Sequence, residues 1–455
     1  MNIAVIADDL TGANDTGVQM ARQGLTTSVL LELKTGGGKQ EAVVFDTDSR
    51  SLPPLEAYQK VKDVCLFLGR GGESSSPVIY KKFDSTLRGN IGSELDAVYE
   101  TLQPDFIVIA PSFPGAGRTL TDGIVYVNGI PLHETEMAHD PKHPATESAF
   151  TAILKRQSRY PAAHFSLEQL RGERTALREL IAGYRKSGIP YLVFDAEREE
   201  DLALVASLFP VKTGSPSVVW AGSAGLASAI TAQVLCSMRE ESEQAGVVLK
   251  ESGKIYEAIS NNKPVYYDAN YVIIVIGSVN PWSRRQLSEL VKENNVSAIM
   301  VESDRLLFPS TCGKELDRVR ELAIGMISRE RKHVALYTSG DPDEVERVRE
   351  LGRASGLSPT EVGERISAEL GRVAADIIAE CGIRHMVLTG GDTAKQVCRH
   401  LSDVEIMLID EVENGVPLGR TPGEAGRYII TKAGAFGSDQ VLVRSVKALQ
   451  KGVRS

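Results

Sequence analysis

The chain has 455 residues, of which 42% are hydrophobic and 24% charged, as in a globular protein. A single core rarely serves this length, so two or three domains are expected. The net charge of -9 argues against a nucleic-acid partner. No apolar run approaches the roughly 18 residues of a membrane span. The five cysteines lack metal-ligand spacing, and no leader precedes the first expected strand, which predicts a cytoplasmic protein.

The first expected strand ends at two acidic residues. Residues 3–6 form an apolar run, typical of a strand buried on both faces of a parallel sheet. Asp8 and Asp9 follow it, and a helix is expected from Thr11 onward. Ligands bind at the carboxyl ends of strands in open α/β sheets. Adjacent carboxylates repel unless a cation or hydrogen-bonding ligand lies between them. Asp8 and Asp9 are therefore candidate substrate-binding residues, although either alone could merely cap the helix.

A second polar cluster follows the strand expected at residues 42–45 and contains Asp46, Asp48 and Arg50. Asp-Xaa-Asp after an apolar strand resembles the nucleophile loop of haloacid-dehalogenase-type phosphatases. That loop has Thr or Val where this chain has Arg50, so a sugar phosphatase is kept only as an alternative. A guanidinium at a strand end is suited to binding a carboxylate or phosphate through two hydrogen bonds.

The densest group of reactive side chains follows the strand expected from Val78 to Phe83. An ammonium, a carboxylate, hydroxyls and a guanidinium lie together at a strand-to-helix junction. Such a set suits a small ligand with a carboxylate and several hydroxyls. Lys82 and Arg88 are expected at the negative end of the ligand, and Asp84 and Ser85 at its alcohols. The alternative is a capped turn that faces solvent.

The order of helices and strands predicts two α/β domains. The first is expected over residues 1–240 and the second over residues 271–455, with a polar connecting segment at 241–270. Each domain is expected to have a mainly parallel sheet flanked by helices, with the active site in the cleft between the domains. A capping box at residues 358–361 is expected to begin a long helix of the second domain.

Glycine-rich turns at expected strand ends characterise the second domain. The strongest follows the apolar run 386–389 and leads into a helix, and such a turn leaves backbone N–H groups free to bind phosphate. A Walker loop does not occur in the sequence, which excludes a P-loop NTPase. Each turn taken singly could be an ordinary tight connection. The candidate nucleotide-binding residues are Ser278, Gly390, Gly391, Asp392, Thr393, Gly415 and Gly434.

Five segments, in the order ADDLTGA, KFDSTLRGN, PSFPGAGR, GGDTA and KAGAFG, resemble the four-carbon acid sugar kinase family. The resemblance covers nearly the whole chain. It implies an N-terminal acid-sugar-binding domain, a C-terminal nucleotide-binding domain and ATP-dependent phosphorylation of the terminal C4 hydroxyl. D-Threonate or D-erythronate is the expected substrate, with 3-oxo-tetronate as a further candidate. A non-catalytic sugar-acid sensor is the alternative from another class, but it would not need the glycine-rich turns.

The resemblance also implies roles for individual residues. The expected mechanism is direct in-line transfer from ATP, with Mg2+ bridging the phosphates. Asp84 and Asp9 are the candidate proton acceptors, which the sequence does not separate. Lys82 or Arg88 could neutralise the transferring group. No metal ligand is assigned, and a homodimer is left open. By position, the acid sugar is assigned to Asp9, Arg50, Lys82, Phe83, Asp84 and Ser85, and ATP to Ser278, the Gly390–Thr393 turn and Gly434; Asn280 departs from the family pattern.

Overall fold

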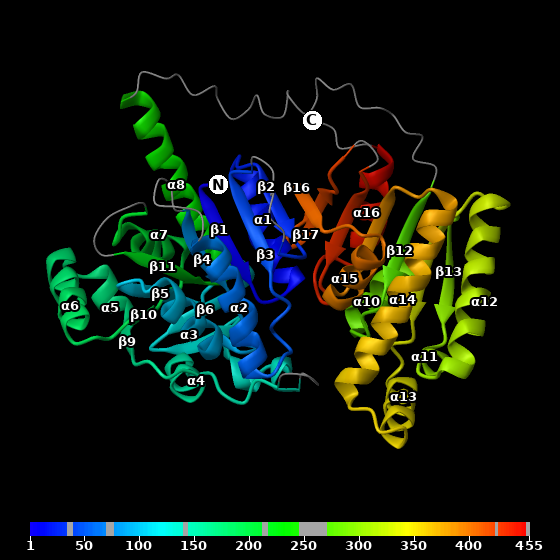
Figure 1. The fold of residues 1–455 in the computed structure, drawn as a ribbon, viewed down its shortest axis with the longest axis horizontal. Helices are drawn as coiled ribbons and strands as arrows, with labels where there is room; N and C mark the ends of the chain where they lie inside the picture. The colour runs from blue at the N-terminus through cyan, green and yellow to red at the C-terminus, as the bar shows by residue number, and fades with distance from the viewer. Residues whose placement is uncertain are drawn as a thin grey trace. The chain divides into compact units, whose positions relative to one another are not determined.

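The computed structural model describes residues 1–33, 40–69, 77–139, 144–211, 217–244, 271–423 and 426–451. The chain divides into two compact units, Met1–Ser252 and Gly253–Ser455. Each unit has a sheet flanked by helices (Figure 1), which confirms the expected α/β class. Most of the connecting segment expected at 241–270 lies outside the described residues. The active site expected between the domains stays a prediction.

The sheet of the first unit is parallel throughout. Its strands are β1 (Ile3–Ala7), β2 (Thr27–Leu30), β3 (Ala42–Asp46), β4 (Val78–Lys82), β5 (Phe106–Ala110), β9 (Ala162–Phe165), β10 (Tyr191–Phe194) and β11 (Val218–Gly222). Their order is β2-β3-β1-β4-β11-β5-β10-β9. The central strands are apolar and buried at every position of β1 and β5 because helices cover both faces. All carboxyl ends therefore meet at one edge.

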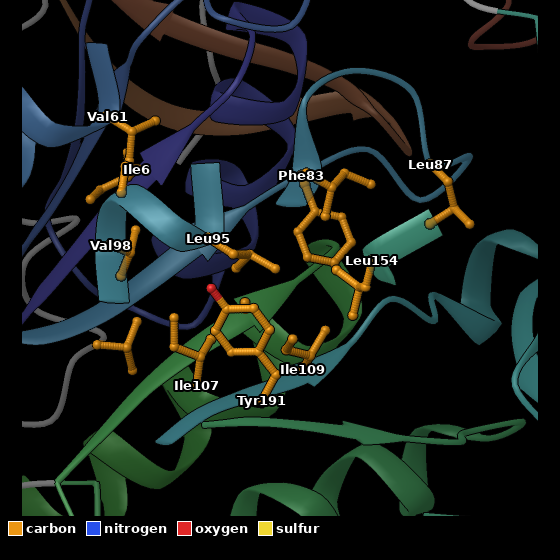
Figure 2. Close-up of a cluster of buried hydrophobic side chains, with 14 of the residues drawn as sticks. Ile6, Val61, Phe83, Leu87, Leu95, Val98, Ile107, Ile109, Leu154 and Tyr191 are labelled. Atoms are coloured by element: carbon orange, nitrogen blue, oxygen red, sulfur yellow. The ribbon is translucent and has the colours of Figure 1, made fainter. Parts of the chain in front are cut away.

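The helices of the first unit are α1 (Leu10–Arg22), α2 (Pro54–Gly69), α3 (Ile91–Leu102), α4 (Phe150–Gln157), α5 (Leu167–Arg171), α6 (Arg174–Lys186), α7 (Glu199–Ser207) and α8 (Ala224–Gln244). Helices α2, α3 and α4 pack on one face, and α1, α7 and α8 pack together on the other. Figure 2 shows the core under the first group, in which Val61 lies beside Ile6, and Leu95 lies near Tyr191.

Two local predictions in this unit need correction or extension. The single helix expected at residues 169–187 is wrong, because the chain breaks at Gly172 and forms α5 and α6 on either side. The hairpin turn expected at Asn128–Gly129 is confirmed, with φ of 52° and 80°. It belongs to a three-stranded antiparallel sheet of β6 (Arg118–Thr121), β7 (Ile124–Val127) and β8 (Ile130–Pro131), whose first strand the sequence did not predict. Short 3-10 helices flank this sheet at 114–116, 132–134 and 136–139.

The second unit repeats the α/β pattern with an antiparallel extension. Its strands are β12 (Val272–Ile276), β13 (Val296–Val301), β14 (His333–Thr338), β15 (His385–Thr389), β16 (Glu405–Glu413), β17 (Val416–Arg420) and β18 (Tyr428–Lys432). Their order is β13-β14-β12-β15-β18-β17-β16, parallel from β13 to β18 and antiparallel at β17 and β16. The carboxyl ends of β12, β15 and β18 thus lie side by side.

The helices of the second unit are α10 (Pro281–Leu290), α11 (Ser303–Leu306), α12 (Pro309–Ser328), α13 (Pro342–Ala354), α14 (Pro359–Cys381), α15 (Gly391–His400) and α16 (Val441–Lys451). Helices α10 and α16 cover one face of the sheet, and α12, α14 and α15 pack together. The capping box is confirmed, since Ser358 and Glu361 bond each other's backbone at the start of α14. No helix within the described ranges is long and apolar enough to cross a membrane.

Candidate active site

The acidic and basic residues singled out in the first unit converge at one edge of its sheet. Ala7 at the end of β1 pairs in register with Asp46 of β3 and with Lys82 of β4. The polar turns after these neighbouring strands therefore start at the same level. This edge, with Asp8, Asp9, Arg50, Lys82, Asp84, Ser85 and Arg88, is called the acidic-basic edge below.

Arg50 links the two aspartates that follow β1. Its Nε and Nη2 donate to Asp8 at 2.8 and 2.9 Å, and its Nη1 and Nη2 donate to Asp9 at 2.5 and 2.7 Å. The guanidinium was expected to bind a carboxylate through two hydrogen bonds, and the carboxylates it binds are the chain's own. Asp9 Oδ1 also accepts from Gly12 N at 2.7 Å and so caps α1. Asp9 therefore caps helix α1 and is also part of the acidic-basic edge.

The two aspartates differ in acidity. Burial alone would raise the pKa of Asp8, but the charge and hydrogen bonds of Arg50 lower it below its ordinary value, helped by Lys81 and Lys82. The pKa of Asp9 is raised, because burial and the negative charge of Asp8 outweigh Arg50. Asp8 is thus held as a carboxylate, whereas Asp9 is the stronger base of the two.

Asp84 is held by cationic and hydroxyl partners. Arg88 Nε forms a short ion pair with it, and Thr86 Oγ1 donates to its Oδ2 at 2.7 Å. Burial would raise the pKa of Asp84, yet Arg88 and Arg50 lower it well below the ordinary value. Asp84 is consequently a weak proton acceptor. Arg88, expected to bind the ligand's negative end, instead bonds this carboxylate.

Lys82 and Ser85 have the freest polar groups of the edge. Lys82 is 4% exposed and has no ion-pair partner among the residues with described positions. A Cβ on Gly12 would lie 2.8 Å from both Lys82 Nζ and Asp9 Oδ1, so the ammonium and the carboxylate flank this glycine. Ser85 is half-buried and its hydroxyl bonds no other described group. Gly12 was not among the predicted site residues, although it lies in the ADDLTGA segment.

Phe83 does not contribute its side chain to the edge. It is 1% exposed and lies among the buried hydrophobic side chains of Figure 2. Its ring stacks on that of Phe150, with ring centroids 5.9 Å apart. The expected role of Phe83 in substrate binding stays a prediction, and its ring lies in the core between β4 and α4. Strand alternation explains why, since Lys82 and Phe83 point to opposite faces.

A buried ion pair adjoins the acidic-basic edge and was not predicted from the sequence. Lys81 Nζ lies 2.6 Å from Glu94 of α3, and both side chains are 1% exposed. Glu94 also accepts from Ser49 Oγ at 2.6 Å, and Lys81 donates to Lys82 O at 2.9 Å. The pair therefore joins α3 to the turns that bear Arg50 and Lys82. Its only sequence signal was the Lys81-Lys82 doublet, which puts one ammonium on each face of β4.

The glycine-rich turns of the second unit also converge. Thr389 pairs in register with Ile276 and Lys432. A Cβ on Gly277 would lie 2.0 Å from Thr393 Oγ1, and one on Gly434 would lie 2.2 Å from Ser278 Oγ. These contacts place the turns after β12, β15 and β18 against one another, and we call them the glycine-turn cluster. Its members are Gly277, Ser278, Gly390, Gly391, Asp392, Thr393 and Gly434.

The glycine-turn cluster contains the N-terminal turn of helix α15 and adjoins the N-terminus of α10. Gly390 has φ of 98° and precedes α15, whose first turn contains Gly391, Asp392 and Thr393. The backbone N–H groups of such a turn favour phosphate. Asn280, which departs from the family pattern, caps α10 by accepting from Trp282 N at 2.8 Å.

Gly415 has a local explanation of its own. It forms the β16–β17 hairpin turn with φ of 74°, and a Cβ there would lie 2.3 Å from Phe436 Cδ1. Nothing in the described structure links it to Ser278. Within the described ranges no group of three or more His, Cys, Asp and Glu residues could hold a metal ion.

Two family models match the chain. The model described as a sugar-binding N-terminal domain covers residues 3–230, and the one described as a nucleotide-binding C-terminal domain covers residues 273–442. A D-threonate kinase of Salmonella typhimurium is 34% identical over 97% of both chains. A D-erythronate kinase of Heliobacterium modesticaldum is 28% identical over 98% of this chain and 97% of its own.

The chain belongs to the four-carbon acid sugar kinase family. As a member it is a sugar-acid kinase, which confirms the family resemblance read from the motifs. The acidic-basic edge lies in the part matched as sugar-binding, and the glycine-turn cluster in the part matched as nucleotide-binding. The crystal structure of a Salmonella typhimurium LT2 protein has the same fold, with a TM-score of 0.74 and 23% identity over 98% of both chains.

Proposed function

We propose that this kinase transfers the terminal phosphoryl group of ATP to the C4 hydroxyl of a four-carbon acid sugar. D-Threonate or D-erythronate is the proposed substrate, and 3-oxo-tetronate is a further candidate. The observation that carries the proposal is the meeting of Lys82, Asp9 and Arg50 at one strand edge of the part matched as sugar-binding. The names of the two relatives support the choice of a four-carbon acid.

Lys82 is the proposed partner of the substrate carboxylate. Arg50 and Arg88 already bond the chain's own aspartates, whereas Lys82 is a buried ammonium without an ion-pair partner in the described part of the chain. A buried charge is costly unless it is paired, so an anionic ligand at Lys82 would be stabilised. Ser85, beside it along the chain, is proposed to bond a substrate hydroxyl.

Asp9 is the proposed acceptor of the proton of the attacking hydroxyl. A general base works best when its pKa lies near the working pH. The raised pKa of Asp9 meets this demand better than the strongly lowered pKa of Asp84. Asp84 is proposed to position Arg88 and Thr86 instead.

The glycine-turn cluster is proposed to bind ATP. The backbone N–H groups at the start of α15 and the hydroxyls of Ser278 and Thr393 suit phosphate oxygens. Mg2+ is commonly held by one or two carboxylates together with the phosphates of the substrate, and the carboxylate of Asp392 in this first turn fits that donor set. The ion would neutralise phosphate charge during the transfer.

The alternatives from other classes have less support. A phosphatase would need Asp46 as nucleophile, but Asp46 Oδ1 accepts a hydrogen bond from Asp48 N of its own turn at 3.0 Å. A sensor without catalysis does not fit a chain that belongs to a kinase family.

ADP release tests the proposal. Purified protein would be given ATP and Mg2+ with D- and L-threonate, D- and L-erythronate or the 3-oxo acids. Turnover is expected on D-threonate or D-erythronate, and on neither without ATP. ADP release with none of these acids, although ATP binds, would overturn the substrate proposal. Failure to bind ATP would overturn the kinase proposal itself.

A further inference from the structure

Lys432 is a buried ammonium at the glycine-turn cluster. It ends β18 and is 2% exposed. Its register partner Thr389 lies two residues after Val387, and Lys432 itself lies two residues after Ile430; both apolar residues belong to the core under α10 and α16. Strand alternation therefore places Lys432 on that same face. Its Nζ donates to Gly434 O at 3.1 Å, at the turn that touches Ser278.

No carboxylate compensates this charge. Among the residues that the structure describes, none forms an ion pair with Lys432, and its hydrogen bond goes to a backbone carbonyl. Burial alone lowers the pKa of Lys432 to about 7. Thr389, its neighbour on β15, is fully buried, and its Oγ1 has no hydrogen-bond partner among the residues with described positions. A lysine in this setting is costly for the empty protein and gains from an anionic ligand.

A second cation without a carboxylate partner adjoins the same turn. Arg284 of α10 donates from Nη2 to Ser278 O and from Nη1 to Thr338 O at 2.5 Å, and its guanidinium lies over the Tyr337 ring. Burial lowers its pKa as well. Both partners are backbone carbonyls, so the positive charge of Arg284 is not neutralised by them. Two uncompensated cations thus border the Ser278–Gly434 contact.

The other charged groups of the neighbouring helices are engaged elsewhere. Asp392 and Lys395 of α15 have contacts of their own. Glu289 of α10 pairs with Lys292, and Lys447 of α16 pairs with Glu293. Arg444 of α16 pairs with Glu413, and Arg420 of β17 lies over Tyr428. None of these acidic side chains forms an ion pair with Lys432 among the described residues.

We propose that Lys432 and Arg284, which bond the touching turns at Gly434 and Ser278, together form the cationic receptor for the phosphate chain of the nucleotide. The proposal rests on the ATP-dependent function proposed above and adds a residue pair to its nucleotide site. Lys432 would bond phosphate oxygens that the backbone turns hold from the other side. Arg284 would fix the Ser278 turn and add its charge.

Proton uptake gives a direct test. In the protein without ligand, the side-chain amine of Lys432 is mostly unprotonated at pH 8, because its pKa is about 7. A bound phosphate chain raises that pKa, so ATP binding takes up a proton. Isothermal titration of ATP into the full chain, in two buffers of different ionisation heat, measures the uptake. Wild type is expected to show it.

Three variants separate charge from structure. Lys432→Arg keeps the charge permanently, so it should bind ATP without the proton uptake. Lys432→Met should bind ATP at least about tenfold more weakly at pH 6.5, since one phosphate ion pair is lost, while its thermal midpoint without ligand does not fall. The exposed Lys447, whose side chain is 54% exposed, provides the matched control: Lys447→Met should behave as wild type.

Equal ATP affinity and equal proton uptake in wild type, Lys432→Met and Lys432→Arg would overturn the proposal while leaving the kinase function intact. Weaker binding of the phosphorylated sugar acid with unchanged ATP affinity would also overturn it, because the receptor would then serve the product. If Lys432→Met does not fold, the proton uptake on ATP binding is compared between wild type and Lys432→Arg, and equal uptake in the two overturns the proposal. A wild type that binds no ATP would instead sink the proposed function.

Discussion

Asp8 and Asp9 are neighbours in the chain, yet their surroundings give them different acidities. Arg50 bonds both, but only at Asp8 do Arg50, Lys81 and Lys82 together outweigh burial and lower the pKa. The sequence predicted that these acids end a strand, because strand periodicity and strand-end polarity are local signals. It did not predict that Arg50 binds both of them. It could not choose between Asp9 and Asp84 as base. That choice depends on which arginine reaches which carboxylate, and the register of β1, β3 and β4 decides it.

Substitution of the two candidate bases, Asp9 and Asp84, should lower kcat to different extents. Asp9→Asn is expected to lower kcat by about a hundredfold or more, as for loss of a general base. Asp84→Asn should lower kcat by less than about tenfold, because a carboxylate with a strongly lowered pKa accepts protons poorly. Steady-state kinetics at saturating ATP measures both. The reverse order of effects would reassign the base to Asp84.

The absence of a side chain at Gly12 leaves room for Lys82 Nζ and Asp9 Oδ1 on either side of it. Gly12→Ala would put a Cβ 2.8 Å from Lys82 Nζ and Asp9 Oδ1, so both must move. A misplacement of this size is expected to lower kcat/KM by about tenfold to a hundredfold. Gly183→Ala in α6 is the control: its Cβ meets nothing within 4 Å, and kcat/KM should not change. Unchanged kinetics of Gly12→Ala would contradict the placement of Lys82 at the substrate.

At the scale of elements, helix α3 and strand β4 are joined by the Lys81–Glu94 pair. The sequence predicted both elements but not their link, because a single Glu in an expected helix gives no signal of the buried Lys81 that it pairs with. The same limit applies to α5 and α6. A single helix was expected across Gly172, and the break is evident only from the backbone. Where the signal is local, as in the capping box of α14, the prediction held.

Removal of one partner of the buried pair should be costly. Glu94→Gln leaves Lys81 charged and buried, which is expected to lower the free energy of unfolding by about 3 to 5 kcal/mol. The double variant Lys81→Met with Glu94→Gln should recover part of that loss, because no buried charge remains. Urea unfolding of the full chain measures both. A single variant as stable as wild type would show that Glu94 does not compensate Lys81.

For the whole molecule, the two units divide the chemistry as the motifs predicted. The first holds charged side chains at its strand ends, and the second holds glycine turns at helix starts. Both groups could be located from the sequence because, in open α/β sheets, ligand-binding residues lie at the carboxyl ends of the strands. It did not reveal Lys432 as a separate feature, since burial of an ammonium without a counter-ion is visible only after packing.

The position of the transferred phosphoryl group tests the central claim most directly. D-Threonate would be incubated with the protein, ATP and Mg2+, and the product examined by phosphorus–proton correlation NMR. Phosphorus coupled to the two protons on C4, with one ADP formed for each phosphate ester, is the predicted result. Phosphorus coupled to the proton on C2 or C3, or ADP formed with free inorganic phosphate and no ester, would contradict a C4 sugar-acid kinase.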